Sequence, residues 1–206
     1  MATRKYEQRL RAEAAEETRR RILDALYHRL REAPTEPVSV DRVARMAGVA
    51  RSTVYLIFGS RAGLFLALSG DLLERGGFER MLRESTHPNA REGLRRGIRA
   101  TARMFAAERD VIRALTSMAQ LDADADAVGG AVQRMEAGRA TGARFRAERL
   151  ADQDALGPGM TVEQAADILW VLTSFDAFDL LYTGRGLSAD QAAEILADAA
   201  ERSLCR

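Results

Sequence analysis

Apolar residues recur at spacings of three and four along almost the whole chain, and this pattern is the strongest limit on its fold. Such spacing places apolar side chains on one side of an α-helix, and runs of β-branched residues that favour strands are absent. Proline and glycine clusters at 33–37, 157–159 and 184–186 mark breaks. We predict an all-α protein of about nine helices, near residues 13–33, 39–46, 51–58, 61–83, 91–107, 109–121, 127–153, 162–183 and 188–203, with an acidic connector at 122–126.

Composition narrows the class of protein. With 206 residues, 47% of them hydrophobic, the chain can bury a real core. It contains no run of about 18 apolar residues, and its first 20 residues are rich in arginine and lack the apolar stretch of a secretory signal. Because Cys205 is the single cysteine, an intrachain disulfide is excluded, and we expect a cytoplasmic location without a membrane partner.

The motifs of several enzyme classes are missing. The sequence has neither a Gly-Lys dipeptide, which a phosphate-binding Walker loop needs, nor a Gly-x-Ser-x-Gly nucleophile motif. His28 and His87 are the only histidines, too few for a His-Glu-x-x-His zinc site. We therefore predict no catalytic residue, no metal site and no cofactor.

Residues 38–61, VSVDRVARMAGVARSTVYLIFGSR, combine two short helical patterns with a tight turn at Gly48. This is the spacing of a helix-turn-helix, whose second helix enters the major groove of DNA. One side of the pair is apolar and predicts a small shared core of Val43, Ala44, Ala47, Val49 and Val54. The other side of the second helix carries Arg51, Ser52, Tyr55 and Leu56, a surface with donors for base edges and phosphates.

The segment from about residue 15 to 66 resembles the TetR family of transcriptional repressors. The matching residues are V-x-x-V-A-x-x-A-G-V at 40–49 and S-T-V-Y-x-x-F-G-S-R at 52–61, followed by Leu64 and preceded by Thr18-Arg19 and Ile22-Leu23-x-Ala25. The resemblance implies an N-terminal three-helix helix-turn-helix DNA-binding domain at 1–65. It also implies a C-terminal helical ligand-binding and dimerisation domain at 66–206, whose last helices are similar to one large regulatory-domain group.

The resemblance also implies roles for individual residues. Thr53, Tyr55 and Arg61 would contact phosphates, and Ser39 would cap the second helix and touch a phosphate. Arg51, Ser52 and Leu56 would face bases, with Arg42 and Thr18 as further backbone contacts. Four positions depart from the family pattern: Pro34 and Thr35 replace a Gly-aromatic pair, Ala50 replaces a capping Ser or Thr, and Ile57 replaces a His or Tyr. Helix-turn-helix geometry also occurs in bundles that bind no DNA, where Tyr55 would be a core residue.

The last two predicted helices carry more apolar surface than one neighbour can cover. Two faces of the helix at 162–183 are apolar, which predicts burial between two neighbours. One neighbour can be a second copy of the chain, so we predict a homodimer. Its interface would contain Val162, Ala165, Leu169 and Leu172 together with Ala192, Ile195, Leu196 and Ala199. The alternative is that both faces serve the intrachain core.

Methionine and aromatic residues in the C-terminal region predict an adaptable apolar pocket for a small-molecule effector. The candidates are Met104, Phe105, Met118, Met135, Phe145, Trp170, Phe175 and Phe178, each of which could also be ordinary core. Two carboxylates, Asp176 and Asp179, extend one face of the same helix. Because unpaired buried carboxylates are costly, they must be exposed, paired with arginine across an interface or reserved for a cationic ligand.

These features predict a ligand-responsive, dimeric DNA-binding transcriptional regulator, a repressor released from a pseudo-palindromic operator when a small molecule binds. The alternatives are a helical enzyme or ligand carrier with a vestigial helix-turn-helix, and a DNA-binding scaffold without a ligand. The charge distribution favours DNA binding. The formal net charge of +1 combines residues 1–65, with 13 basic and 8 acidic side chains, and residues 66–206, with 18 and 22.

Overall fold

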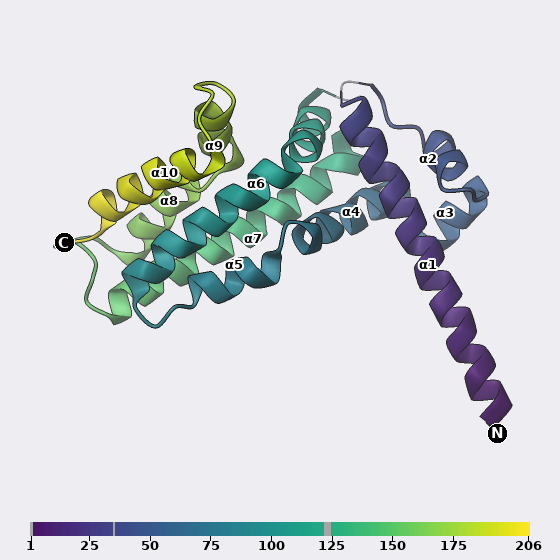
Figure 1. Ribbon diagram of the computed structural model, residues 1–206, viewed down its shortest axis with the longest axis horizontal. Coiled ribbons are helices and arrows are strands. Elements are labelled where there is room, and N and C mark those ends of the chain that lie inside the picture. The colour runs from purple at the N-terminus through teal and green to yellow at the C-terminus, as the bar shows by residue number, and fades with distance from the viewer. Residues whose placement is uncertain (1, 35, 122–124) are drawn as a thin grey trace. The chain divides into compact units, whose positions relative to one another are not determined.

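The computed structural model describes residues 2–34, 36–121 and 125–206, and within these ranges the chain forms ten helices (Figure 1). They are α1 (Ala2–Glu32), α2 (Val40–Met46), α3 (Arg51–Phe58), α4 (Arg61–Arg75), α5 (Phe78–Ser85), α6 (Ala90–Leu121), α7 (Ala125–Asp152), α8 (Val162–Leu172), α9 (Phe175–Tyr182) and α10 (Ala189–Leu204). The described residues contain no strand, and the predicted all-α class is confirmed.

The chain divides into two compact units. One holds Met1–Asp71 and Asp110–Gln133, and the other holds Leu72–Arg109 and Arg134–Arg206. We call them the N-terminal unit and, after the role predicted for most of its residues from the sequence, the regulatory unit. The predicted boundary at 65/66 lies within α4, six residues before the observed division, and residues 110–133, predicted in the second domain, cluster with the first. Helices α4, α6 and α7 each continue from one unit into the other.

The core of the N-terminal unit is built on α1. Its predicted apolar stripe is buried, and the first turns of the helix extend past α2 and α3 (Figure 1). Helices α2 and α3 pack their short apolar faces together, as their spacing predicted. The buried residues are Ile22, Leu23, Leu26 and Leu30 of α1, Val40, Val43 and Ala44 of α2, and Val54 of α3.

The regulatory unit packs α10 against α8 and α9. Small side chains make this close packing possible, because Ala192, Ala193, Ala197 and Ala200 of α10 are all fully buried. Capping boxes at Thr161 and Ser188 fix the first turns of α8 and α10.

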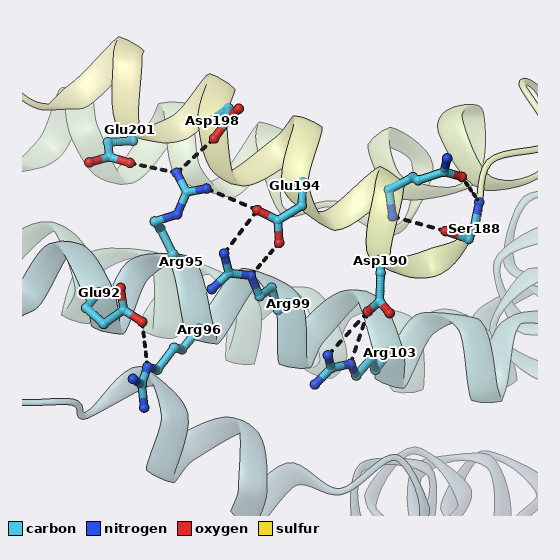
Figure 2. A network of polar contacts seen from close by, with 11 residues as sticks. Glu92, Arg95, Arg96, Arg99, Arg103, Ser188, Asp190, Glu194, Asp198 and Glu201 are labelled. Atoms are coloured by element: carbon cyan, nitrogen blue, oxygen red, sulfur yellow. Dashed lines mark hydrogen bonds and ion pairs between the residues drawn. The ribbon is translucent and has the colours of Figure 1, made fainter.

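Helix α10 is also joined to α6 by a row of ion pairs (Figure 2). The Arg95 guanidinium lies 2.7 Å from Glu201, 2.8 Å from Asp198 and 3.0 Å from Glu194. Arg99 also binds Glu194, and its hydrogen bond holds the pKa of that carboxyl below its usual value. Partly exposed pairs of this kind fix the register of two helices more than they add stability.

Helix α1 begins at Ala2 and not near residue 13 as predicted. Three further predicted helix boundaries are wrong, each for a local reason. The helix predicted at 61–83 is broken into α4 and α5 at Gly76-Gly77, where Gly77 has a φ of 80°. The break predicted near 108–110 does not exist, because Glu108, Arg109 and Asp110 are polar but compatible with a helix, and α6 runs through them.

The helix predicted at 162–183 is the third of these, because it is interrupted between α8 and α9. There the Thr173 hydroxyl donates to the Leu169 carbonyl at 2.6 Å, and Ser174 caps α9 by accepting from the Ala177 amide. Serine and threonine bind nearby backbone groups and thereby compete with a continuing helix.

Residues 122–124 of the predicted acidic connector lie outside the described residues. In the described part of the chain no single helix is long and apolar enough to cross a membrane. The bent pair α3 and α4, at 68° to each other, reaches that threshold together by length and composition alone.

Candidate functional site

The turn between α2 and α3 has the backbone geometry that the sequence predicted. Gly48 has a φ of 66°, a conformation that costs glycine little, and the Val49 amide donates to the Ala44 carbonyl at 3.0 Å. Ala50 precedes α3 and supplies no side-chain cap, as expected for alanine. The turn and the shared core of Val43 and Val54 fix the direction in which α3 presents its outer face.

The outer face of α3 is open, and Leu56 is its most exposed apolar residue. The Leu56 side chain is 85% exposed, which makes it the most exposed large apolar residue of the described chain. Arg51 and Ser52 are exposed, and Thr53 and Tyr55 are half-buried. Tyr55 is therefore not a core residue. The arrangement leaves the predicted base-facing residues accessible.

Arg51 is held in place by two neighbours. Its guanidinium donates to the Asp41 carboxylate at 2.7 Å and to the Tyr55 hydroxyl at 3.3 Å, and it lies over the Tyr55 ring at 5.5 Å. The hydrogen bond with Tyr55 and the charge of Asp41 raise the pKa of Arg51. Asp41, an acidic residue in the first turn of α2 ten positions before Arg51, was not predicted from the sequence as a partner of this arginine.

The loop before α2 is organised by Arg29, which is fully buried. Its guanidinium donates to the carbonyls of Ala33 at 2.7 Å, Glu36 at 3.2 Å and Pro37 at 3.2 Å, and to the Glu36 carboxylate at 3.0 Å. The Glu36 carboxylate also accepts from Arg42 at 3.0 Å. This chain of contacts fixes the loop in which Pro34 departs from the family pattern, and it ties the predicted phosphate contact Arg42 to the core; Thr35 lies outside the described residues.

The other predicted DNA contacts differ in whether their side chains already bind groups of the same chain. Ser39 stands at the N-cap position of α2 but makes no capping hydrogen bond, so the predicted cap is wrong and its exposed hydroxyl is uncommitted. Arg61 donates to the Val38 carbonyl at 3.3 Å and lies over the Phe65 ring, and the Thr18 hydroxyl donates to Ala14. The contacts of all three with phosphate stay predictions.

In the regulatory unit, aromatic rings gather around Phe105. Its ring lies 5.5 Å from Phe175 and 5.8 Å from Phe178, which stacks on Tyr182 at 5.1 Å. Beside them is a cavity of about 10 Å³, enough for about one water molecule. It is lined by Ile98, Thr101, Ala102, Phe105, Thr173, Ser174, Phe178 and Leu196.

The remaining candidate pocket residues do not line this cavity. Phe145 and Trp170 are more than a third exposed and lie under the guanidinium groups of Arg149 and Arg139. Met135 is half-buried on α7. Phe175 joins the aromatic cluster but does not line the cavity. The other two are buried: Met104 in the regulatory unit and Met118 in the part of α6 that belongs to the N-terminal unit. The structure thus brings Phe105 and Phe178 together at the cavity, and the wider pocket stays a prediction.

The predicted dimer face needs a correction. Ala165, Leu169, Ala192 and Leu196 are buried within their own chain, so they have no surface left for a partner. Val162, Leu172 and Ala199 are half-buried, and Ile195 is 47% exposed. The intrachain core thus takes one apolar face of α8 and α10. The large apolar side chains that α8, α9 and α10 leave exposed are Trp170, Val171, Leu180 and Ile195.

The two carboxylates on α9 have different environments. Asp179 is buried, and its Oδ1 accepts from Arg109 Nε at 2.7 Å and from the Thr183 hydroxyl at 2.7 Å. Asp176 is exposed. Exposure, one of the three predicted possibilities, therefore applies to Asp176, whereas Asp179 pairs with an arginine of its own chain and not across an interface. Over the ranges that the structure describes, no group of three His, Cys, Asp or Glu side chains could hold a metal ion.

The fold and the geometry of α2 and α3 define a class of protein, an all-helical helix-turn-helix regulator of the kind that binds DNA. Residues 22–68 match the family profile described as bacterial regulatory proteins, tetR family. This match covers the helix-turn-helix region, which is that of the TetR family of transcriptional regulators, and does not extend over the rest of the chain.

Solved structures show the same fold along the chain. The NalD protein of Pseudomonas aeruginosa, described as the secondary repressor of the MexAB-OprM multidrug efflux pump, is 26% identical, with a TM-score of 0.70 over 93% of this chain and 98% of NalD. A TetR family regulator from Marinobacter aquaeolei is 15% identical, with a TM-score of 0.64 over 94% and 98% of the two chains. PfmR from Thermus thermophilus is 19% identical, with a TM-score of 0.61 over 90% and 99%. A search of curated protein sequences found no match.

Proposed function

We propose that the protein is a ligand-responsive repressor that binds a pseudo-palindromic DNA operator as a homodimer. The observation that carries the proposal is the outer face of α3, the second helix of the helix-turn-helix. On this face Arg51 and Ser52 are exposed and Leu56 is 85% exposed. Arginine reads guanine in the major groove, and an apolar side chain fits a thymine methyl group. The description of NalD as a repressor supports the sign of regulation.

The DNA interface is tested by selecting bound sequences from a random DNA pool and measuring affinity over a salt series. We expect an inverted repeat and an affinity that falls steeply with salt, because phosphate contacts release counterions. Arg51→Ala should weaken operator binding about tenfold to a hundredfold, while Arg83→Ala, an exposed arginine of α5, should leave it unchanged. Equal affinity for scrambled DNA would refute the interface and favour a vestigial helix-turn-helix.

The dimer is supported by the exposed apolar side chains of α8, α9 and α10. Val171 is 59% exposed and Leu180 is 70% exposed, which is costly for large apolar residues in a single chain. Light scattering at micromolar concentration should give twice the chain mass of 22.7 kDa, and Val171→Asp with Leu180→Asp should return it to that mass. A wild-type protein of 22.7 kDa would contradict the dimer.

Effector binding is supported by the aromatic cluster and the cavity at Phe105 and Phe178. Because that cavity has room for only about one water molecule, an effector requires the helices around it to separate. A thermal-shift screen tests this, since a ligand that binds the folded state raises the melting temperature. Operator release by the same compounds would establish a ligand-responsive repressor, whereas DNA binding that no compound affects would identify a scaffold.

A further inference from the structure

A buried positive charge in the regulatory unit has no anionic partner in the described chain. Arg146 of α7 is only 9% exposed. Its one hydrogen bond among the described residues runs from Nη2 to the Ser85 hydroxyl of α5 at 3.3 Å, and its Nε has no partner. Burial, together with the like charge of Arg139, lowers the pKa of Arg146 to about 10, which leaves the guanidinium charged at neutral pH.

The Nε–Nη2 edge of this guanidinium has the geometry that binds a carboxylate. Nε and Nη2 lie on one edge of the planar group, and parallel hydrogen bonds from such an edge match the two oxygens of a carboxylate. The edge faces Gly97 of α6, where a Cβ atom would lie 3.1 Å from Arg146 Nε and 2.5 Å from Ser85 Oγ. A larger residue at 97 would therefore crowd this edge.

The neighbouring arginines have other tasks. Arg149, one turn further along α7, donates to the carbonyls of Ser85, His87 and Pro88 and so satisfies the C-terminal end of α5. Arg139 is paired with Glu136 at 2.7 Å. Arg146 contributes to neither arrangement, because its one contact is the Ser85 hydroxyl rather than a carbonyl. An unpaired buried charge is too costly to be explained as packing.

We propose that Arg146 binds the carboxylate of the effector, which replaces the Ser85 hydroxyl at the Nε–Nη2 edge. The effector is a small organic acid with an apolar body, because the flanking positions of α6 and α7 are buried and apolar, namely Leu94, Ile98, Ala143 and Ala147. Of these, Ile98 also lines the cavity at Phe105, so an effector that reaches both sites requires the helices around them to separate. The inference rests on the proposed effector response and assigns its chemical class.

The experiment measures the melting temperature of the protein without DNA in the presence of benzoate, phenylacetate and hexanoate. Each acid is paired with its uncharged primary amide, and sodium sulfate is included as a plain anion. We expect at least one carboxylate to raise the melting temperature while its amide and sulfate do not. Equal shifts by acid and amide, equal shifts by sulfate, or no shift by any carboxylate at millimolar concentration would overturn the proposal.

Variants assign the effect to the residue. Arg146→Gln should weaken carboxylate binding at least about tenfold, because it removes a charge-assisted pair of hydrogen bonds. Arg144→Gln is the matched control on the same helix, since Arg144 is exposed and paired with Glu148 at 2.9 Å. Ser85→Ala should strengthen binding by removing the competing hydroxyl. If Arg146→Gln fails to fold, Arg146→Lys keeps the charge but loses the edge, and undiminished binding to it would contradict the proposal.

Operator release separates this inference from the proposed function. If neutral compounds release the operator while no carboxylate shifts the melting temperature, the repressor proposal stands and the Arg146 site is wrong. If carboxylates stabilise wild type and Arg144→Gln but not Arg146→Gln, and no operator can be selected, the site is correct and the repressor proposal is wrong.

Discussion

Arg29 and Arg146 are both buried, one in each compact unit, and their surroundings are opposite. Arg29 donates to three carbonyls and to Glu36, whereas Arg146 donates to a single hydroxyl at 3.3 Å. The first fixes the loop before α2 through both of its terminal nitrogens and has Glu36 as a counter-charge, although its Nε, like that of Arg146, has no partner in the described chain. The second is a charge without a counter-charge. The difference is therefore the counter-charge: Glu36 supplies it to Arg29, and the proposed carboxylate ligand would supply it to Arg146.

The largest expected effect on stability comes from a substitution that removes the contacts of Arg29. Arg29→Met should lower the free energy of unfolding by about 3 kcal/mol, because it removes hydrogen bonds from a buried charged group and leaves three carbonyls without this donor. Urea denaturation measures the change. Arg31→Met, at an exposed position of the same helix, should change it by less than about 0.5 kcal/mol. Equal effects of the two substitutions would show that the Arg29 contacts contribute little.

A second pair of substitutions tests how tightly the N-terminal unit is packed. A Cβ atom at Gly63 would lie 2.0 Å from the Phe58 carbonyl oxygen, so Gly63→Ala must shift the backbone between α3 and α4 and should cost about 2 kcal/mol. A Cβ atom at Gly70, on the same helix, would have no neighbouring atom within 4 Å apart from its own helix turn. Gly70→Ala should therefore stabilise the protein by up to about 1 kcal/mol. Thermal unfolding of both variants measures whether the signs are opposite.

The same substitution at Arg146 should change the free energy of unfolding in the opposite direction to that at Arg29. Arg146→Met should raise the free energy of unfolding by about 1 kcal/mol at pH 7, because it removes an unpaired buried charge. The pKa of Arg146 is lowered to about 10 in the folded state, so its cost is fully present at neutral pH and shrinks as the pH rises through that value. Urea denaturation of both proteins at pH 7 and above pH 10 checks this; a destabilised variant would make Arg146 a structural residue like Arg29.

The smallest effect concerns the ion pairs between α6 and α10 (Figure 2). Glu194→Gln should lower the free energy of unfolding at pH 7 by less than about 1 kcal/mol, because the pairs with Arg95 and Arg99 are partly exposed. The pKa of Glu194 is lowered in the folded state, so its contribution is present above its ordinary value and is lost as the pH falls through the lowered one. Thermal unfolding of wild type and variant between pH 3 and 7 measures this loss. Added salt should also reduce the contribution of Glu194, because it screens the ion pairs. A stability difference between variant and wild type that grows in acid would contradict the expected sign.

Local patterns made the fold and the outer face of α3 predictable from sequence. The spacing of Val43, Ala44 and Val54 defined the helix-turn-helix core, and the remaining positions of α3 were outward by elimination. Side-chain contacts between separate elements were not predictable. The pairing of Arg51 with Asp41, and of Asp179 with Arg109, depends on how helices distant in sequence approach each other.

The burial of α8 and α10 was not predictable for the same reason. Periodicity showed that Leu169 and Ala192 lie on apolar faces, but it could not distinguish an intrachain neighbour from a second copy. The break at Thr173-Ser174 was missed because hydroxyl contacts with the backbone leave little trace in hydropathy.

The exposure of Leu56 has a thermodynamic consequence for the proposed DNA interface. A side chain that is 85% exposed in the free protein keeps apolar surface in water until the groove covers it. Covering it contributes a negative heat-capacity change and a part of the affinity that added salt does not screen. Calorimetry of Leu56→Ala against wild type should therefore show a less negative heat-capacity change, while the slope of affinity against salt concentration stays the same.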